Sequence, residues 1–106
     1  MDIGDPPVGD PMAMRSFAAT LRADAEAVAA RAAWLARRAE RMTFEGPAAA
    51  DFRQSMLDTR RAAERASAEL RDIANHVLSA ATRVETDIAD YNRYRESLES
   101  REGRAS

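Results

Sequence analysis

The chain has 106 residues, a formal net charge of −2 and 45% hydrophobic residues, a balance that suits one small soluble domain and argues against two. Much of the hydrophobic share is alanine, which buries little area, so the composition excludes a thick globular core. The absence of cysteine excludes disulfides, thiolate metal sites and cysteine nucleophiles. All 16 basic residues are arginine, and 18 acidic residues balance them, so the sequence predicts no concentrated basic face for nucleic acid.

Residues 1–10 are predicted to form a flexible leader. They contain neither the basic and apolar regions of a cleaved signal peptide nor part of an apolar run long enough to span a membrane. Asp10 followed by Pro11 is typical of a helix start, because the Asp side chain accepts from free amides and Pro suits the first helical position. A first helix is therefore predicted over residues 11–42, where residues that favour helix continue without interruption.

Apolar residues along this first helix recur at alternating spacings of four and three, which predicts a stripe that faces a second helix. The stripe consists of Met14, Ala18, Leu21, Ala25, Val28, Ala32, Leu35, Ala39 and Met42. A second helix is predicted over residues 47–98, and residues 101–106 are predicted to fray. The stripe of this second helix has the same spacing and consists of Ala49, Phe52, Met56, Thr59, Ala63, Ala66, Leu70, Ile73, Val77, Ala80, Val84, Asp87, Tyr91, Tyr94 and Leu98.

The break between the two helices is predicted at residues 43–46. Gly46 permits a backbone reversal, and Pro47 suits the first turn of the next helix. The sequence therefore predicts an all-α fold, an antiparallel two-helix hairpin within residues 11–100. Folding the chain at this break is expected to leave everything past about Ala80 without an opposing helix.

Two packed helices form a layer without an interior, so a lone hairpin buries little area for the residues that it orders. Both helices carry further apolar residues beside their stripes, Phe17 and Trp34 on the first and Leu57 and Leu78 on the second. These four are the predicted partner-binding residues. Through them the hairpin would join a similar hairpin, as a homodimer or a heterodimer, in a four-helix bundle. The alternative is that Phe17 and Trp34 are scattered surface aromatics.

Two alanine-rich helices joined at Phe44-Glu45-Gly46 resemble the WXG family, the small early-secretory-antigen-like proteins of type VII secretion systems. The resemblance covers about residues 12–94, and the family's Trp-x-Gly turn maps onto Phe44, Glu45 and Gly46, with Phe in place of Trp. It implies that the Phe44 ring packs across the end of the hairpin and that Gly46 supplies the turn. It also implies a secreted protein that leaves the cell through a type VII system without a cleaved signal peptide.

The family's C-terminal export signal, Tyr-x-x-x-Asp/Glu, has no match here, because Arg95 follows Tyr91 at the fourth position and Leu98 follows Tyr94. The resemblance therefore implies the partner that lacks the signal, exported as a passenger, or a divergent member. Tyr91 and Tyr94 are the predicted contact with the secretion machinery; the alternative is that they only end the stripe.

The use of arginine alone beside abundant alanine is typical of GC-rich coding and fits an actinobacterial origin.

No enzyme chemistry is predicted. His76 is the only histidine, and Asp72, four residues before it, does not complete a metal site, so neither a metal nor a cofactor is expected. Acidic residues alternate with arginine along both helices, without a phosphate-binding loop or a nucleophile motif. The predicted function is that of a type VII substrate or secretion partner, whose contacts are a similar hairpin, the secretion machinery or a larger effector. The alternative is a cytoplasmic coiled-coil adaptor or structural protein that self-associates.

Overall fold

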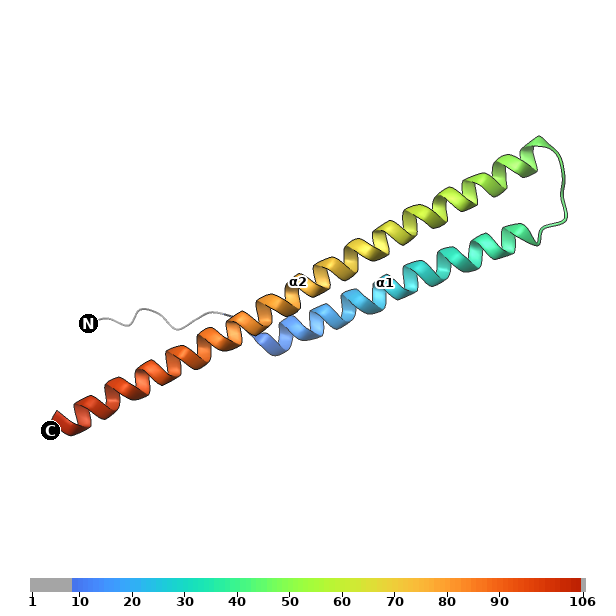
Figure 1. Cartoon of the computed structure of the whole chain (residues 1–106). Helices are drawn as coiled ribbons and strands as arrows, with labels where there is room; N and C mark the ends of the chain where they lie inside the picture. The colour runs from blue at the N-terminus through green and yellow to red at the C-terminus, as the bar shows by residue number, and fades with distance from the viewer. Residues whose placement is uncertain (1–8, 106) are drawn as a thin grey trace.

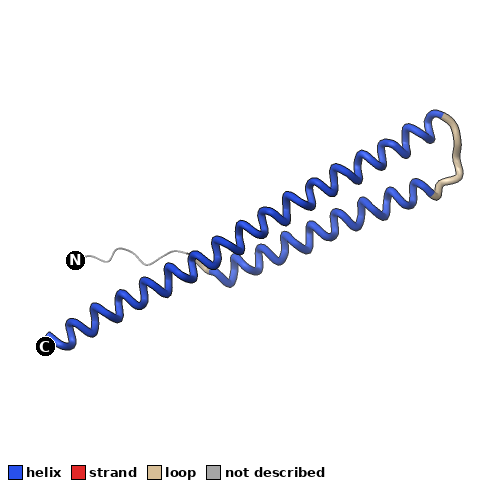
Figure 2. Tube along the Cα trace, in the orientation of Figure 1, coloured by secondary structure: helices blue, strands red, loops and turns tan. Residues whose placement is uncertain are grey.

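The computed structural model describes residues 9–105, which form two antiparallel α-helices and no strand (Figure 1). Helix α1 spans Pro11–Glu40 and helix α2 spans Pro47–Ala105. A single loop joins them at one end of the molecule (Figure 2). The predicted all-α helical hairpin is confirmed.

The helix ends differ from the predicted ones at two places. Helix α1 ends at Glu40 rather than at residue 42. Helix α2 continues past residue 98 and includes residues 101–105, which the sequence predicted to fray. Of the predicted leader, residues 1–8 lie outside the described residues.

The start of α1 follows the predicted chemistry. Oδ1 of Asp10 accepts hydrogen bonds from the backbone N–H of Met12 at 3.1 Å and of Ala13 at 3.2 Å. Pro11 occupies the first helical position. These bonds satisfy two of the N–H groups that have no partner within the first turn of a helix.

The loop between the helices is held by Arg53. Its Nη2 donates to the backbone oxygens of Met42 and Phe44, both at 3.0 Å, and its guanidinium lies 5.1 Å from the centre of the Phe44 ring. The Phe44 ring lies 5.9 Å from that of Phe52. Gly46 enters α2 with a φ of +105°, and a Cβ there would meet nothing within 4 Å. Glycine is thus needed for the backbone conformation and not for space.

The pairing of the helices is shifted from the predicted one. Arg15 of α1 bonds Glu85 of α2, and Gly9 lies against Val84, whose Cγ1 would be 3.0 Å from a Cβ at that glycine. The unopposed part of α2 therefore begins after Glu85 and not at about Ala80. The shift arises because the first turns of α2 lie beside the loop rather than beside α1.

Small residues form the interface between the helices. The buried residues are Ala18, Ala25, Ala32, Ala36 and Ala39 of α1 and Ala49, Ser67, Ala74 and Ala81 of α2. The hydroxyl of Ser67 donates to the backbone oxygen of Ala25 at 2.8 Å, so this buried polar group has a partner. Alanine lets two helices approach closely but contributes little apolar area.

One of the two predicted columns of the α2 stripe is displaced by one residue. The column that includes Ala49, Met56 and Leu70 is buried or half-buried, as predicted. The other buried or half-buried column is Arg53, Arg60, Ser67, Ala74, Ala81 and Ile88. It takes the place of Phe52, Thr59, Ala66, Ile73, Ala80 and Asp87, of which all but the half-buried Ala80 are exposed. The fully buried members of the observed column, Ser67, Ala74 and Ala81, are small, whereas the large Phe52 and Ile73 lie at the side of the interface.

Several large residues predicted to lie between the helices are consequently exposed. The exposed fractions of Phe52 and Ile73 are 38% and 48%. Those of Val28 and Leu35 on α1 are 37% and 40%, and that of Met42 in the loop is 47%. The hairpin therefore leaves much of its large apolar side-chain surface outside its own interface.

The folded chain is a rod. Its Cα atoms extend over 90 × 17 × 12 Å, and the last part of α2 projects beyond α1 as a single helix (Figure 1). Within the described residues, neither helix contains a stretch apolar and long enough to cross a membrane.

Candidate partner-binding surface

One long face of the hairpin, the polar face, is bridged by polar contacts between the helices. Arg15 donates two hydrogen bonds to the Glu85 carboxylate, one of them at 2.7 Å. Arg22 donates to Oδ1 of Asn75 at 2.9 Å. The hydrogen bonds from Arg15 hold the pKa of Glu85 below its ordinary value, and those same bonds raise the pKa of Arg15. This face is thus occupied by contacts that the hairpin makes with itself.

Helix geometry places the α2 column that contains Phe52 and Ile73 on the face opposite the polar face. Successive residues turn by about 100° around a helix axis. Leu70 and Val84 belong to the same half-buried column of α2. Glu85 follows this column by one residue, at Val84, and Ile73 follows it by three, at Leu70. The side chains of Glu85 and Ile73 therefore point about 160° apart around α2.

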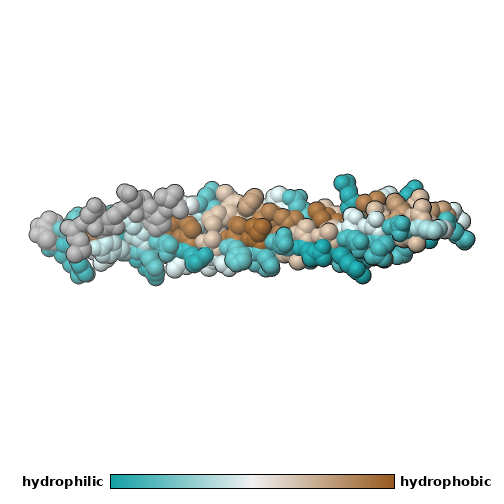
Figure 3. Space-filling model, turned by 90° about the horizontal axis from the view of Figure 1, so that it is seen from above, coloured by the Kyte–Doolittle hydropathy of each residue, from teal (hydrophilic) through white to brown (hydrophobic). Residues whose placement is uncertain are grey.

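The same reasoning applies to α1. Arg22 follows buried Ala18 by four residues and Val28 follows buried Ala25 by three, so Arg22 and Val28 lie on opposite sides of the buried column. One column from each helix thus forms a second long face, the apolar face. Its exposed large residues are Val28 and Leu35 of α1, Met42 of the loop, and Phe52, Ile73 and Tyr94 of α2. In Figure 3, hydrophobic residues run lengthwise across the view and hydrophilic residues line its lower edge.

The apolar face was missed as a surface because hydrophobic periodicity assigned its residues to the interior. A signal for it was present in the sequence, since Ala18, Ala25, Ala32 and Ala39 recur at every seventh residue. A column made only of the smallest apolar residue indicates the line of closest approach between two helices. The large residues beside such a column then lie outside the contact.

The structure does not bring the four predicted partner-binding residues to one face. Leu57 and Leu78 each follow the half-buried α2 column by one residue, so they lie on the polar face. Phe17 is exposed at the rim of the apolar face. Trp34 points to the outer side of α1, where the Arg38 guanidinium lies 5.3 Å from the ring centre. Of the four, Phe17 alone adjoins the apolar face.

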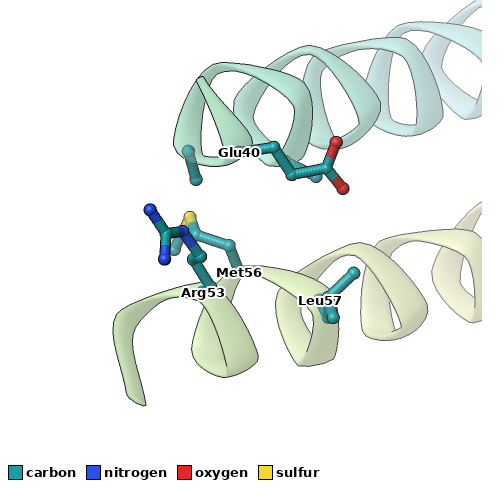
Figure 4. Close-up of a pocket in the computed structure, with 6 residues that line it drawn as sticks. Glu40, Arg53, Met56 and Leu57 are labelled. Carbon is teal, nitrogen blue, oxygen red and sulfur yellow. The ribbon is translucent and has the colours of Figure 1, made fainter. Parts of the chain in front are cut away.

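A small pocket lies on the polar face near the loop, with a volume of about 140 Å³. It is lined by Ala36, Ala39 and Glu40 of α1 and Arg53, Met56 and Leu57 of α2. Figure 4 shows Arg53 and Met56 projecting from α2 toward α1, with Glu40 on the facing helix. This volume is close to the roughly 150 Å³ that holds one benzene-sized group. The pocket therefore suits a single side chain.

The remaining predicted site residues lie at the two ends of the rod (Figure 1). Phe44, Glu45 and Gly46 lie in the loop at one end. Tyr91 is half-buried and Tyr94 is exposed on the projecting part of α2. The predicted turn motif and the predicted contact with the secretion machinery are therefore far apart.

His76 and Asp72 are both exposed on α2. Among the residues that the structure describes, no three His, Asp or Glu side chains gather in a way that could hold a metal ion. Comparisons with protein-family models, curated proteins and solved structures find no match for this chain. Its function is therefore inferred from its own surfaces.

Proposed function

We propose that this chain is a non-enzymatic helical hairpin that acts by binding another helical hairpin through its apolar face. The observation that carries the proposal is the exposure of Val28, Leu35, Phe52 and Ile73 beside an interface made of alanine. Large exposed apolar patches are typical of interaction sites. A side chain of this size contributes about 1.5–3 kcal/mol when it is fully buried, so covering the apolar face supplies free energy that the alanine interface lacks.

Within this function we propose a role like that of the WXG proteins, as a type VII secretion substrate or secretion partner. Two features of the loop support it: the Phe44 ring packs on Phe52, and Gly46 has a positive φ at the start of α2. Export would occur in a complex and without a cleaved signal peptide. Tyr91 and Tyr94, on the projecting part of α2, would contact the secretion machinery.

Export from a bacterium that carries a type VII system tests this role. The tagged chain is expressed in that strain and in a matched strain without the secretion ATPase, together with a cytosolic marker protein. We expect the chain in the culture medium of the first strain alone, with the marker retained inside both. The absence of a Tyr-x-x-x-Asp/Glu signal favours the alternative, a cytoplasmic self-associating adaptor. Retention of an associating chain in both strains would establish that alternative.

A further inference from the structure

We propose that the partner on the apolar face is a second copy of this chain, packed antiparallel to the first across a two-fold axis near Ile73. This inference rests on the proposed function and names its partner. The α2 column on the apolar face consists of Phe52, Thr59, Ala66, Ile73, Ala80, Asp87 and Tyr94, at intervals of seven, and all but the half-buried Ala80 are exposed. Its residue types read the same in both directions: aromatic, polar, alanine, isoleucine, alanine, polar, aromatic.

Antiparallel packing of two α2 helices about Ile73 brings matching residues together. Ile73 meets its own copy on the axis. Ala66 faces Ala80 of the second copy, which lets the helices approach closely on both sides of the axis. Phe52 faces Tyr94 of the second copy, and aromatic pairs of this kind contribute beyond the area that they bury. The column is therefore complementary to itself in this one direction.

The polar residues of the column select the register. In this arrangement the Thr59 hydroxyl faces the Asp87 carboxylate of the second copy, to which it can donate a hydrogen bond. A shift by one heptad would instead place Phe52 against Asp87 and remove water from a carboxylate without a hydrogen-bond partner. Beside the column, the same register sets Glu69 against His76 of the second copy, two groups that attract when the imidazole is protonated.

The lengths of the helices fit the antiparallel arrangement. Helix α2 has 59 residues and α1 has 30, so a single hairpin cannot cover the end of α2. With the axis at Ile73, residues 86–99 lie beside residues 47–60 of the second copy. Each projecting helix is thus covered by the loop half of the other hairpin. A parallel pair would set the two projecting parts together, away from both α1 helices.

The charge distribution favours the same direction. Residues 27–65, the loop half of the rod, contain eight Arg and five acidic residues, whereas residues 9–26 and 66–105 contain eight Arg and eleven acidic residues. Antiparallel packing places the positive half of one copy beside the negative half of the other. Salt screens exposed charges beyond about 8–10 Å, so this asymmetry sets direction more than affinity.

Association is tested first by light scattering of the full chain as a function of concentration. We expect a dimer, and we expect Ile73→Glu to give monomers, because it places two carboxylates on the axis. Ile73 is 48% exposed in the hairpin, so this variant should keep the helical circular dichroism signal. A matched change on the polar face, Leu57→Glu, should leave the dimer intact.

The register is tested at the polar pair. Thr59→Asp sets a carboxylate against Asp87 of the second copy and should raise the dimer dissociation constant about tenfold, whereas Thr59→Arg should lower it, because facing like charges destabilise and opposite charges stabilise. Thr86, on the outer side of α2, supplies the controls: Thr86→Asp and Thr86→Arg should change the constant by less than about twofold. Equal effects of Asp and Arg at Thr59 would overturn this register.

The direction is tested by one distance. The chain has no cysteine, so Glu45→Cys carries a single spin label at the loop. In the antiparallel dimer the two labels lie roughly 70 Å apart, whereas a parallel dimer sets them within about 30 Å, given the rise per residue and the diameter of a helix. A short distance overturns the antiparallel arrangement and leaves the proposed function standing. A monomer at every concentration overturns the second copy as partner, while ATPase-dependent export of that monomer would still support the proposed function.

Discussion

Arg15 ties the start of α1 to α2 through its hydrogen bonds to Glu85. These bonds favour the ionised carboxylate and so lower the pKa of Glu85. A carboxyl group with a lowered pKa in the folded state contributes stability above its unfolded pKa. That contribution is lost as the pH falls through the folded pKa. Both side chains are exposed, so the contribution is that of a surface ion pair, which is small.

Glu85→Gln is therefore expected to lower the melting temperature slightly at pH 7. The difference from the wild type should shrink as the pH falls below 4.5, the ordinary pKa of the group, because the wild-type carboxylate then becomes protonated. Thermal unfolding at a fixed protein concentration over a pH series measures it. Glu96→Gln, on the projecting part of α2, is the control and should leave the melting temperature unchanged both at pH 7 and below pH 4.5. A difference that does not vary with pH would contradict the assignment to this ion pair.

Gly46 is the residue on which the start of α2 depends. Gly46→Val should destabilise the fold, because a positive φ costs an L-residue about 1–2 kcal/mol and more when it is β-branched. A Cβ there meets nothing within 4 Å, so the backbone conformation, and not a clash of that atom, is the expected cause. Thermal unfolding of Gly46→Val against Glu45→Val, which alters a neighbouring position with an ordinary φ, isolates it. Equal melting temperatures would mean that the loop does not need this conformation.

At the scale of the helices, the hairpin could be predicted because local chemistry specifies its boundaries. Asp10 caps α1, and Gly46 allows the chain to enter α2. The choice between neighbouring columns could not be predicted in the same way. Periodicity weighs residues by hydrophobicity and so placed Phe52 and Ile73 inside. Two helices without an interior between them instead meet through small residues, here Ser67, Ala74 and Ala81 of α2.

The candidate surface could be predicted only in part. The sequence predicts Leu57 and Leu78 as flanking residues that bind a partner, and the structure places them on the polar face. Each follows the correctly predicted α2 column by one residue, whereas Phe17 precedes the α1 alanine column by one, so these flanks lie on opposite faces of the hairpin. The α1 alanine column was predicted correctly, and the place of Phe17 beside the apolar face follows from that column.

The alanine interface makes a direct prediction for element packing. Ala25 is fully buried, and Ala25→Leu should force the helices apart and cost about 1–3 kcal/mol, as overpacked cores do. Ala30→Leu, at an exposed position on the same helix, is the control and should be close to neutral. Urea unfolding measures both. A stabilised Ala25→Leu variant would mean that the helices can separate to admit large residues.

At the scale of the whole molecule, α2 has two parts with different support. Residues up to Glu85 pack on α1, whereas residues 89–105 form a helix without α1 beside it. Isolated helices of that length are marginal in water. A second copy in the antiparallel arrangement would cover most of this segment, so its protection depends on association.

Amide hydrogen exchange should report this difference. In the monomer formed by Ile73→Glu, the amides of residues 89–105 should exchange fastest among the helical residues, since few tertiary contacts oppose opening there. In the wild-type dimer, protection should extend to about residue 99. Thr86→Asp serves as the control, because it adds a charge without disturbing the dimer. The same exchange pattern in the monomer and the dimer would contradict coverage by a second copy.

The rod shape affects how the protein behaves in flow and diffusion. Its radius of gyration is 25.1 Å, against about 13 Å for a compact chain of this length. Hydrodynamic friction follows dimensions and not mass, so a single copy should elute from a gel-filtration column where a considerably heavier globular protein does. Elution volume calibrated with globular standards would report an oligomer for every state of this chain.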